Sequence, residues 1–316
     1  MTLLYTDPSF LEHRTGSHPE RPERLMAITR QLERTGLDQK CTRPQWNPVS
    51  PERLERVHKL AYADVVRQFC AAGGGHIEED TLCSERSYDV ALLAAGAACD
   101  AAARVIGGPE KQALCLVRPP GHHALADSPM GFCLFNNIAL AARTATREFD
   151  LNRVLIVDWD VHHGNGTQAQ TWTDPQVGFF SAHRWPFYPG TGRADETGTG
   201  DALGTKLNLP LEFGTPRERY LDRFRSNLEK IAQRMKPELV LISAGFDAHT
   251  DDPVGSLGLE TDDFAVLTDA VLDIADEFAG GRVVSVLEGG YNTGILAGCV
   301  ETHLRHLLAR ERQSQS

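Results

Sequence analysis

The sequence predicts an α/β protein in which helices cover both faces of a central parallel sheet, forming a three-layer sandwich. Short apolar runs, each the length of a buried strand, alternate along the chain with longer patterns typical of helices. Several of these runs end directly in acids, histidines or glycines, as strands do when a site lies beyond their carboxyl ends. The 316 residues contain no linker-like stretch, so we expect a single domain over residues 1–316.

The composition is that of a soluble globular protein, with 41% hydrophobic and 24% charged residues. The formal charge of −11 disfavours stable binding of nucleic acid or of an anionic membrane surface, and it suits a cationic substrate. The seven cysteines are scattered without a CxxC pair, which indicates a reducing compartment and no disulfide framework. Because the sequence also shows no signal-peptide pattern and no run of about eighteen apolar residues, we expect a cytoplasmic protein without a membrane span.

The amino-terminal part supplies helices and an acidic loop. A helix begins near the prolines of the segment 18–25 and runs to about residue 35, and Ser50-Pro51 is typical of the cap and first turn of another. Three glycines at 73–75 form a flexible loop that leads to the acids at 78–80. The alanine-rich and leucine-rich stretch 87–106 is predicted to be a largely buried helix.

The sheet is predicted from the apolar runs and from the helical patterns that separate them. The strands are expected at 3–5, 114–117, 154–157, 177–182, 239–243 and 283–287, with further helices at 136–148, 216–235, 262–278 and 294–310. The glycine-rich segment 190–204 has no GK[ST] ending, so we expect a mobile surface loop there and not a phosphate-binding loop.

Two strand ends carry groups that suit a metal ion. Asp160 and His162 lie two residues apart after the run 154–157, so an extended chain points both side chains the same way. Asp247, after the run 239–243, completes a set of one imidazole and two carboxylates that leaves a fourth position open. We therefore predict a catalytic site for Zn²⁺, with Fe²⁺ as the alternative, because such a metal lowers the pKa of water towards neutrality.

Residues at other strand ends complete the predicted chemistry. His122 and His123 are adjacent after a Pro-Pro-Gly sequence and are candidates for the general base and for the acid that protonates a leaving amine. Asp158 is expected to accept a hydrogen bond from one imidazole, with a plain salt bridge as its alternative role. Tyr291 follows two glycines that allow a tight turn, and its hydroxyl is a candidate for polarising a carbonyl opposite the metal.

Several motifs occur together in a highly specific combination. They are His18-Pro19-Glu20, Arg118-Pro119-Pro120-Gly121-His122-His123, Gly131-Phe132-Cys133, Asp158-Trp159-Asp160-Val161-His162-His163-Gly164 and Gly289-Gly290-Tyr291-Asn292. On these motifs, which span essentially the whole chain, the sequence resembles the zinc-dependent histone deacetylase family of the arginase-like deacetylase superfamily. The resemblance implies the arginase/deacetylase fold and hydrolysis of an N-acyl amine, typically acetyl-lysine, to acetate and the free amine.

Carried over by position, the resemblance implies a role for each candidate. It makes Asp160, His162 and Asp247 the zinc ligands, His122 and His123 the tandem base and acid, and Tyr291 the carbonyl-polarising group. It adds a substrate tunnel with Phe132 and Tyr188 as walls, Gly131 as floor and Asp80 at the rim, and an acetate exit near Arg24. It also implies a structural K⁺ held by Asp158, Ser181 and the main-chain carbonyls of Asp160, His162 and Ala182.

The chain departs from the family pattern at two positions. Asn165 stands where many class I members have an aspartate, so His123 loses a charged partner and is expected to titrate lower. Tyr188 stands where phenylalanine is usual, which alters the tunnel rim. Asn165 and the sequence Glu288-Gly289-Gly290-Tyr291 favour the class II-like branch, which includes bacterial deacetylases and acetylpolyamine amidohydrolases.

Two substrate classes stay open, namely acyl-lysine in proteins or peptides and small acetylated amines such as acetylpolyamines. Val254 is uncharged where polyamine-selective relatives carry a glutamate, so we expect a preference for acyl-lysine, with Glu78 and Glu79 as the alternative source of that charge. A two-metal ureohydrolase is disfavoured because it needs further aspartates around His162. A non-catalytic acyl-lysine reader is disfavoured because neither a ligand nor Tyr291 is lost.

Overall fold

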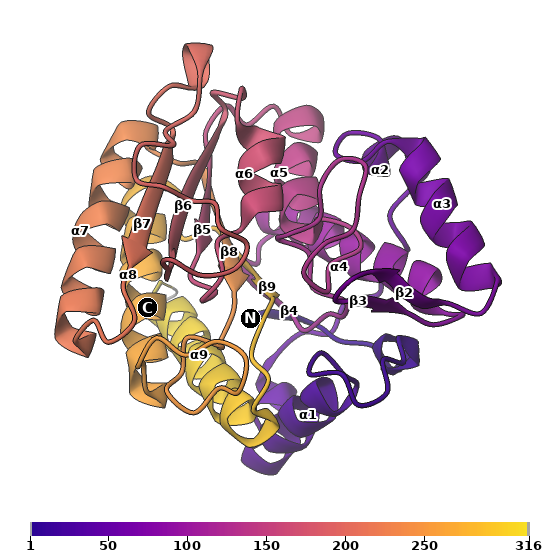
Figure 1. Ribbon diagram of the computed structural model, residues 1–316. Helices are drawn as coiled ribbons and strands as arrows, with labels where there is room; N and C mark the ends of the chain where they lie inside the picture. The colour runs from indigo at the N-terminus through magenta and orange to yellow at the C-terminus, as the bar shows by residue number, and fades with distance from the viewer. Residues whose placement is uncertain (1, 315–316) are drawn as a thin grey trace.

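A parallel sheet forms the centre of the molecule in the computed structural model, which describes residues 2–314 (Figure 1). Met1, Gln315 and Ser316, which the single-domain prediction also covers, lie outside the described residues. Among the described residues, seven strands pair in the order β1 (Leu3–Tyr5), β4 (Gln112–Cys115), β9 (Val283–Leu287), β8 (Leu239–Ala244), β5 (Val154–Asp158), β6 (Val177–Arg184) and β7 (Lys206–Leu211). Every pairing in this sheet is parallel.

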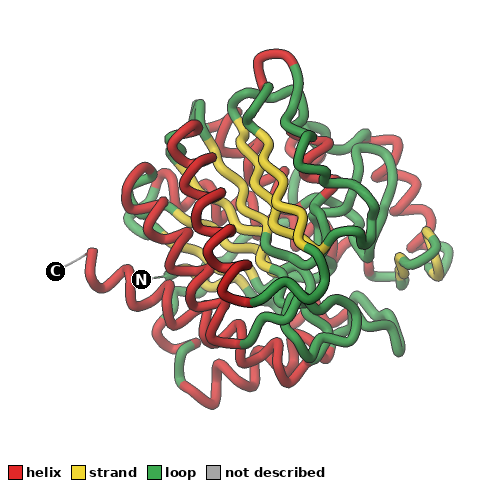
Figure 2. The backbone as a smooth tube through the Cα atoms, turned by 60° about the vertical axis from the view of Figure 1, so that its left-hand side comes forward, coloured by secondary structure: helices red, strands yellow, loops and turns green. Residues whose placement is uncertain are grey.

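Helices cover both faces of the sheet, as Figure 2 shows by the layer of helices in front of the strands. The helices are α1 (Glu23–Thr35), α2 (Pro51–Leu54), α3 (Leu60–Ala71), α4 (Ser87–Gly107), α5 (Asn137–Glu148), α6 (Asn165–Thr171), α7 (Arg217–Met235), α8 (Thr261–Phe278) and α9 (Thr293–Ser314). One layer contains α4, α5 and α6, and the other contains α7, α8 and α9, with α1 packed on α9. The predicted three-layer α/β fold is confirmed, whereas the single-domain organisation stays a prediction.

The central strands are apolar along their whole length because both of their faces are covered. All five residues of β5 and all six of β8 are buried. A strand buried on both faces reads as a continuous aliphatic run, and this is why these strands were predictable from the sequence. Because every strand of the seven-stranded sheet is parallel to its neighbours, the carboxyl ends lie at one edge of the sheet, where the polar clusters come together.

The edge strand β7, a short hairpin and two helices were not predicted. β7 reads Lys-Leu-Asn-Leu-Pro-Leu, and its polar residues and proline conceal a strand, although an edge strand tolerates proline. The loop residues 75–83 form an antiparallel hairpin of β2 (Gly75–Glu78) and β3 (Thr81–Cys83), and α3 and α6 were also missed. Single 3₁₀ turns occur at Pro8–Glu12, Asp38–Lys40 and Gly200–Ala202.

Local signals explain where several helices begin. The hydroxyl of Ser50 accepts a hydrogen bond from the backbone N–H of Arg53, as expected for the cap of α2. Asn136 caps α5 by accepting from the N–H of Ala139. The predicted buried helix corresponds to α4, which by length and composition alone is apolar enough to cross a membrane, although 61% of that stretch is buried inside the molecule. Buried core helices often have this length and composition, so these two properties are weak grounds for a membrane span.

Candidate active site

Three acidic or imidazole groups meet at the carboxyl ends of β5 and β8. Nδ1 of His162 lies 3.0 Å from Oδ1 of Asp160 and 3.1 Å from Oδ2 of Asp247. The three side chains are buried, and one ligand atom from each lies within 4.8 Å of the others. The structure therefore brings together the three residues predicted as metal ligands, and they form a group that can hold a metal ion.

Backbone groups hold the two carboxylates in place. Asp160 accepts hydrogen bonds from the N–H groups of His162 and Gly289, each at 2.9 Å, and Asp247 accepts one from the N–H of Val161 at 2.9 Å. A Cβ atom at Gly289 would lie only 2.3 Å from Oδ2 of Asp247, so the close approach of the β9 end requires glycine. The glycine is thus part of the ligand support.

The electrostatics of this group suit a bound cation. Burial and the neighbouring charge of Asp160 raise the pKa of Asp247 to about 7. Burial alone would lower the pKa of His162, but hydrogen bonds to Asp160 and Asp247 raise it to about 9. Two crowded carboxylates with an imidazole match the donor set and the charge that a divalent metal such as zinc or iron(II) takes.

The two adjacent histidines lie beside this group in different environments. Nδ1 of His122 lies 2.9 Å from a carboxylate oxygen of Asp158, and Nδ1 of His123 lies 2.6 Å from the amide oxygen of Asn165. Burial lowers the pKa of His122, but the carboxylates of Asp158 and Asp160 raise it to about 10. Burial and the neighbouring histidines place the pKa of His123 well below its ordinary value. His123 is therefore the neutral member of the pair.

A buried carboxylate that the sequence interpretation gave no role positions this histidine turn. Glu288, which follows β9, accepts hydrogen bonds from the N–H groups of Gly121 at 2.7 Å and His122 at 3.2 Å. Its other oxygen accepts from the hydroxyl of Ser243 at 3.1 Å. The signal for it was present, because an acid directly after an apolar strand stands at the same edge as the other site residues.

A cavity of about 170 Å³ leads from the surface to these groups. Its lining residues are Asp80, His123, Gly131, Phe132, His162, Phe187, Tyr188, Val254 and Tyr291. The predicted tunnel residues therefore lie together, and Phe187 and Val254 join them. Phe132 has a φ of +70°, a strained backbone conformation for a residue other than glycine, and such strain is found at functional sites. A Cβ atom at Gly131 would lie 2.4 Å from Cδ2 of His123.

Two hydrogen-bonded links support the cavity walls. Thr81 donates its hydroxyl hydrogen to Asp80 at 3.0 Å and accepts the N–H of Phe132 at 3.1 Å, so it ties the β2–β3 turn to the aromatic wall. Asp252 accepts the N–H groups of Tyr291 at 2.7 Å and Val254 at 2.9 Å. Sequence reasoning missed both residues, because nothing in their local sequence distinguishes them from ordinary loop residues.

Tyr188 and Tyr291 stand at opposite depths of the cavity. Tyr188 is 37% exposed, and burial of its ring and the neighbouring charge of Asp80 raise the pKa of its hydroxyl. Tyr291 is buried, with its ring 5.7 Å from that of Phe132 in an edge-on arrangement. Burial raises the pKa of Tyr291 well above its ordinary value, so its phenol keeps the proton that it needs to act as a hydrogen-bond donor.

Arg24 lies behind Tyr291, where it is completely buried. Its guanidinium carbon is 5.0 Å from the centre of the Tyr291 ring, and its Nε donates to the carbonyl of Gly290 at 2.6 Å. A further N–H of Arg24 donates to Glu20 at 3.1 Å, and Glu20 also pairs with Arg118. Arg24 therefore braces the loop that carries Tyr291, and an acetate exit beside it stays a prediction.

The residues predicted to hold K⁺ also lie together. Asp158 and Ser181 stand opposite each other across β5 and β6, and Ala182 follows in β6. Asp158 already accepts an N–H from Asp160 at 3.1 Å in addition to its contact with His122. The arrangement is compatible with the predicted set of oxygen ligands, and the identity of an ion there stays a prediction.

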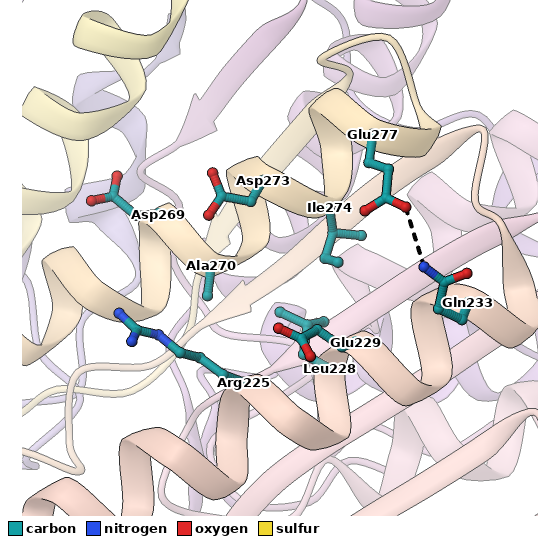
Figure 3. Close-up of a pocket in the computed structure, with 9 residues that line it drawn as sticks. All are labelled: Arg225, Leu228, Glu229, Gln233, Asp269, Ala270, Asp273, Ile274 and Glu277. Atoms are coloured by element: carbon teal, nitrogen blue, oxygen red, sulfur yellow. Dashed lines mark hydrogen bonds between the residues drawn. The ribbon is translucent and has the colours of Figure 1, made fainter.

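A larger hollow, of about 310 Å³, lies between α7 and α8 and is shown in Figure 3. Its side chains come from the outer helices, and Gln233 of α7 donates a hydrogen bond to Glu277 of α8 at 3.2 Å. None of the three clustered ligands contributes to its lining among the described residues. The smaller cavity is therefore the candidate active site, because it contains the reactive groups.

Comparisons with known proteins agree with this geometry. The protein-family model of the histone deacetylase domain matches residues 18–307 of this chain. The histone deacetylase-like amidohydrolase of Pseudomonas aeruginosa is 38% identical over 89% of this chain and 74% of that protein. Human polyamine deacetylase HDAC10 is 40% identical over 97% of this chain and 46% of that protein.

A solved structure, that of the HDA15 HD domain, superposes with a TM-score of 0.93 at 36% identity and covers 98% of this chain and 89% of that one. The family match extends over most of the chain and includes each of the motifs on which the resemblance rested. The chain therefore belongs to the histone deacetylase family, and it is a deacetylase, a hydrolase of amide bonds.

Proposed function

We propose that this enzyme removes acetyl or other short acyl groups from lysine side chains with the help of a zinc ion. One observation carries the proposal, namely that the buried group of Asp160, His162 and Asp247 lies at the inner end of a narrow cavity with aromatic walls. A cavity of this shape suits the slender apolar stem of an acyl-lysine and excludes the bulk of a folded protein.

The side chains have distinct roles in the proposed reaction. Phe132 and Tyr188 hold the stem of the substrate, and Tyr291 donates a hydrogen bond to the acyl oxygen as negative charge develops on it. His123 is neutral and takes the proton of the attacking water, then returns it to the leaving amine. His122 keeps its proton because Asp158 and Asp160 stabilise its charge. The metal, when bound, supplies Lewis acidity to the acyl carbonyl and lowers the pKa of water.

The same proposal includes a structural potassium ion and a place of action. Asp158, Ser181 and the carbonyls of Asp160, His162 and Ala182 would hold K⁺, where oxygen ligands from two neighbouring strands meet. Acetate would leave past Arg24.

The absence of a CxxC pair among seven cysteines supports a reducing, cytoplasmic setting.

A second candidate substrate is an acetylpolyamine. It is favoured by the acidic rim, where Asp80 lines the cavity and Glu78 lies two residues away, and by the relative named polyamine deacetylase. Against it stands Val254, which lines the cavity and offers no charge to a distant ammonium group. Lysine in a peptide is therefore the preferred substrate in our proposal.

The test is turnover by the purified enzyme after its metal content has been measured. Acetyl-lysine peptides, longer acyl-lysine peptides, acetylspermidine and acetylputrescine form the substrate panel. We expect hydrolysis that a chelator abolishes and that Zn²⁺ restores, with a higher kcat/KM for acetyl-lysine peptides than for the polyamines. Restoration by Fe²⁺ alone would replace zinc in the proposal, and a higher kcat/KM for acetylspermidine would replace the substrate.

A further inference from the structure

A guanidinium group lies between two aromatic rings next to the active site. The guanidinium carbon of Arg184, the last residue of β6, is 4.1 Å from the ring centre of Phe187 and 4.4 Å from that of Phe213. Within residues 2–314 no ion pair is formed by Arg184, and its Nε has no hydrogen-bond partner. The two ring faces are therefore the principal partners of this cation.

The inner ring connects the cation to the metal group, which is the set of three proposed ligands Asp160, His162 and Asp247. Phe187 stacks on the imidazole of His162, with ring centres 5.2 Å apart and planes inclined by 16°. Phe187 also lines the substrate cavity. Phe213, Arg184, Phe187 and His162 thus form a continuous stack from the surface to a metal ligand, which we name the Arg184 stack.

Arg184 also contacts a second wall of the cavity. One of its N–H groups donates to the carbonyl of Gly255 at 3.2 Å, and Gly255 directly follows the cavity residue Val254. Asp252 accepts the N–H of Gly255 at 3.0 Å and the N–H of Tyr291 at 2.7 Å. Displacement of Arg184 therefore reaches both the metal group and the loop that supports the tyrosine.

The outer member of the stack stands at the surface. Phe213 is 66% exposed, on the loop between β7 and α7, so burial of its ring contributes little to the core. Its position over the guanidinium gives this exposed ring a specific contact, in which it shields one face of the cation from water. A cation that is shielded on both faces interacts more strongly with the rings that enclose it.

We propose that Arg184 and Phe213 are positioning residues for the deacetylase reaction, which hold Phe187 against His162 and so fix both the imidazole and the width of the cavity. The inference rests on the proposed function, because His162 must be a metal ligand for its orientation to matter. Outer partners of metal ligands typically change metal affinity by about 10- to 100-fold when they are removed. Since Phe213 acts through two intervening groups, we expect the low end of that range.

The experiment compares variants of the full-length zinc enzyme by two measurements. The first is the rate at which zinc is lost to a chelator, and the second is the division between KM and kcat for an acetyl-lysine peptide. For Phe213→Ala we expect roughly tenfold faster zinc loss and a KM raised several-fold, with kcat within about twofold when zinc is saturating. Phe213→Tyr is expected to behave as the parent, whereas Phe213→Leu, which keeps bulk without a ring face, behaves as Phe213→Ala.

Leu203→Ala is the matched control, because Leu203 is 58% exposed on the loop that precedes β7 and lies outside the stack. Arg184→Lys keeps the charge and loses the planar group, so it is expected to match Phe213→Ala in both measurements. Parent-like zinc loss and KM in Phe213→Ala, or equal behaviour of the leucine and tyrosine variants, would overturn the inference. Failure of the parent to hydrolyse acetyl-lysine would count against the proposed function. It would not affect the test of the Arg184 stack, because zinc loss is measured without substrate.

Discussion

Single residues determine whether the metal group can hold an ion, because each ligand is buried and each carboxylate is held by a backbone N–H. The carboxylate of Asp247 is held in this way by Val161, and its raised pKa reflects its burial and the charge of Asp160 close by. A divalent cation would relieve the repulsion between the carboxylates of Asp160 and Asp247 and would stabilise their charged forms. Loss of one ligand from a set of three leaves a site that holds metal poorly.

Asp247→Ala is therefore expected to remove the bound zinc and, with it, the activity. Metal analysis of the purified variant gives the result directly. Asp195→Ala serves as the control, because Asp195 is an exposed aspartate that pairs with Arg193 at the surface. Full zinc content in the Asp247 variant would contradict the ligand assignment.

Tyr291→Phe is expected to lower kcat by roughly a hundredfold or more, the scale of removing one donor to a developing oxyanion. The ring packing on Phe132 is preserved in this variant, so folding and zinc content should not change. Tyr88→Phe, on α4 and outside the cavity, is the matched control. Activity of Tyr291→Phe within a few-fold of the parent would show that the hydroxyl takes no part in the reaction.

At the scale of elements, one histidine joins the α2–α3 connection to the start of α5. His58, between α2 and α3, donates from Nδ1 to the carbonyl of Leu125 at 2.9 Å and accepts the N–H of Asn136, the cap of α5, at 2.8 Å. The contact with Asn136 requires the neutral ring, because a protonated imidazole has no nitrogen that can accept an N–H. Burial lowers the pKa of His58 to about 4, below its ordinary value of 6.5.

This histidine makes stability depend on pH in a definite direction. Between pH 6.5 and pH 4 the unfolded chain binds a proton at His58 that the folded chain does not. The contribution of His58 to the free energy of unfolding is therefore fully present above pH 6.5. This contribution falls by up to about a few kcal/mol as the pH falls towards 4. We expect urea unfolding at pH 7 and pH 5 to show a smaller difference for His58→Gln than for the parent. The exposed His76→Gln is the control, and an unchanged pH difference in His58→Gln would remove His58 from this account.

The elements that could be predicted from the sequence are those with a strong local signal. β5 and β8 were evident because strands buried on both faces are apolar throughout, and α8 was placed within one residue of its observed start at Thr261. The edge strand β7 and the β2–β3 hairpin were not, because their residues are polar and their pairing is decided by neighbours distant in sequence.

At the scale of the whole molecule, the net charge of −11 favours cationic substrates in general, and the cavity mouth decides among them. Val254→Glu is expected to shift the ratio of kcat/KM values towards acetylspermidine by tens to hundreds of fold, since a carboxylate facing an ammonium is worth about a few kcal/mol when partly buried. Val254→Gln is the matched uncharged control. The prediction fails if the glutamate and glutamine variants have the same ratio, and the acidic turn at Glu78 would then be the source of selectivity.

The convergence of the site was predictable because parallel strands end at one edge, so Asp160, His162, Asp247 and Tyr291 had to meet. Among the supporting residues, Glu288 had a signal in the sequence, because it directly follows the apolar strand β9. The roles of Asp252 and Arg184 were not predictable, since they exist only as contacts between distant segments. Asp252 accepts the backbone N–H of Tyr291 from another loop, and Arg184 acts through the ring of Phe213, which a different turn positions. Such contacts have no signature in the local sequence.

The pairing of β5 with β8 also sets the order in which the enzyme can acquire its metal during synthesis. His162 and Asp247 are 85 residues apart, and their side chains meet only when these two strands are neighbours. A growing chain on the ribosome offers an ion two of the three ligands until β8 has emerged and paired. On the proposed function, metal loading would follow this pairing, and the ion would stabilise the assembled sheet because it binds the folded chain and not its parts.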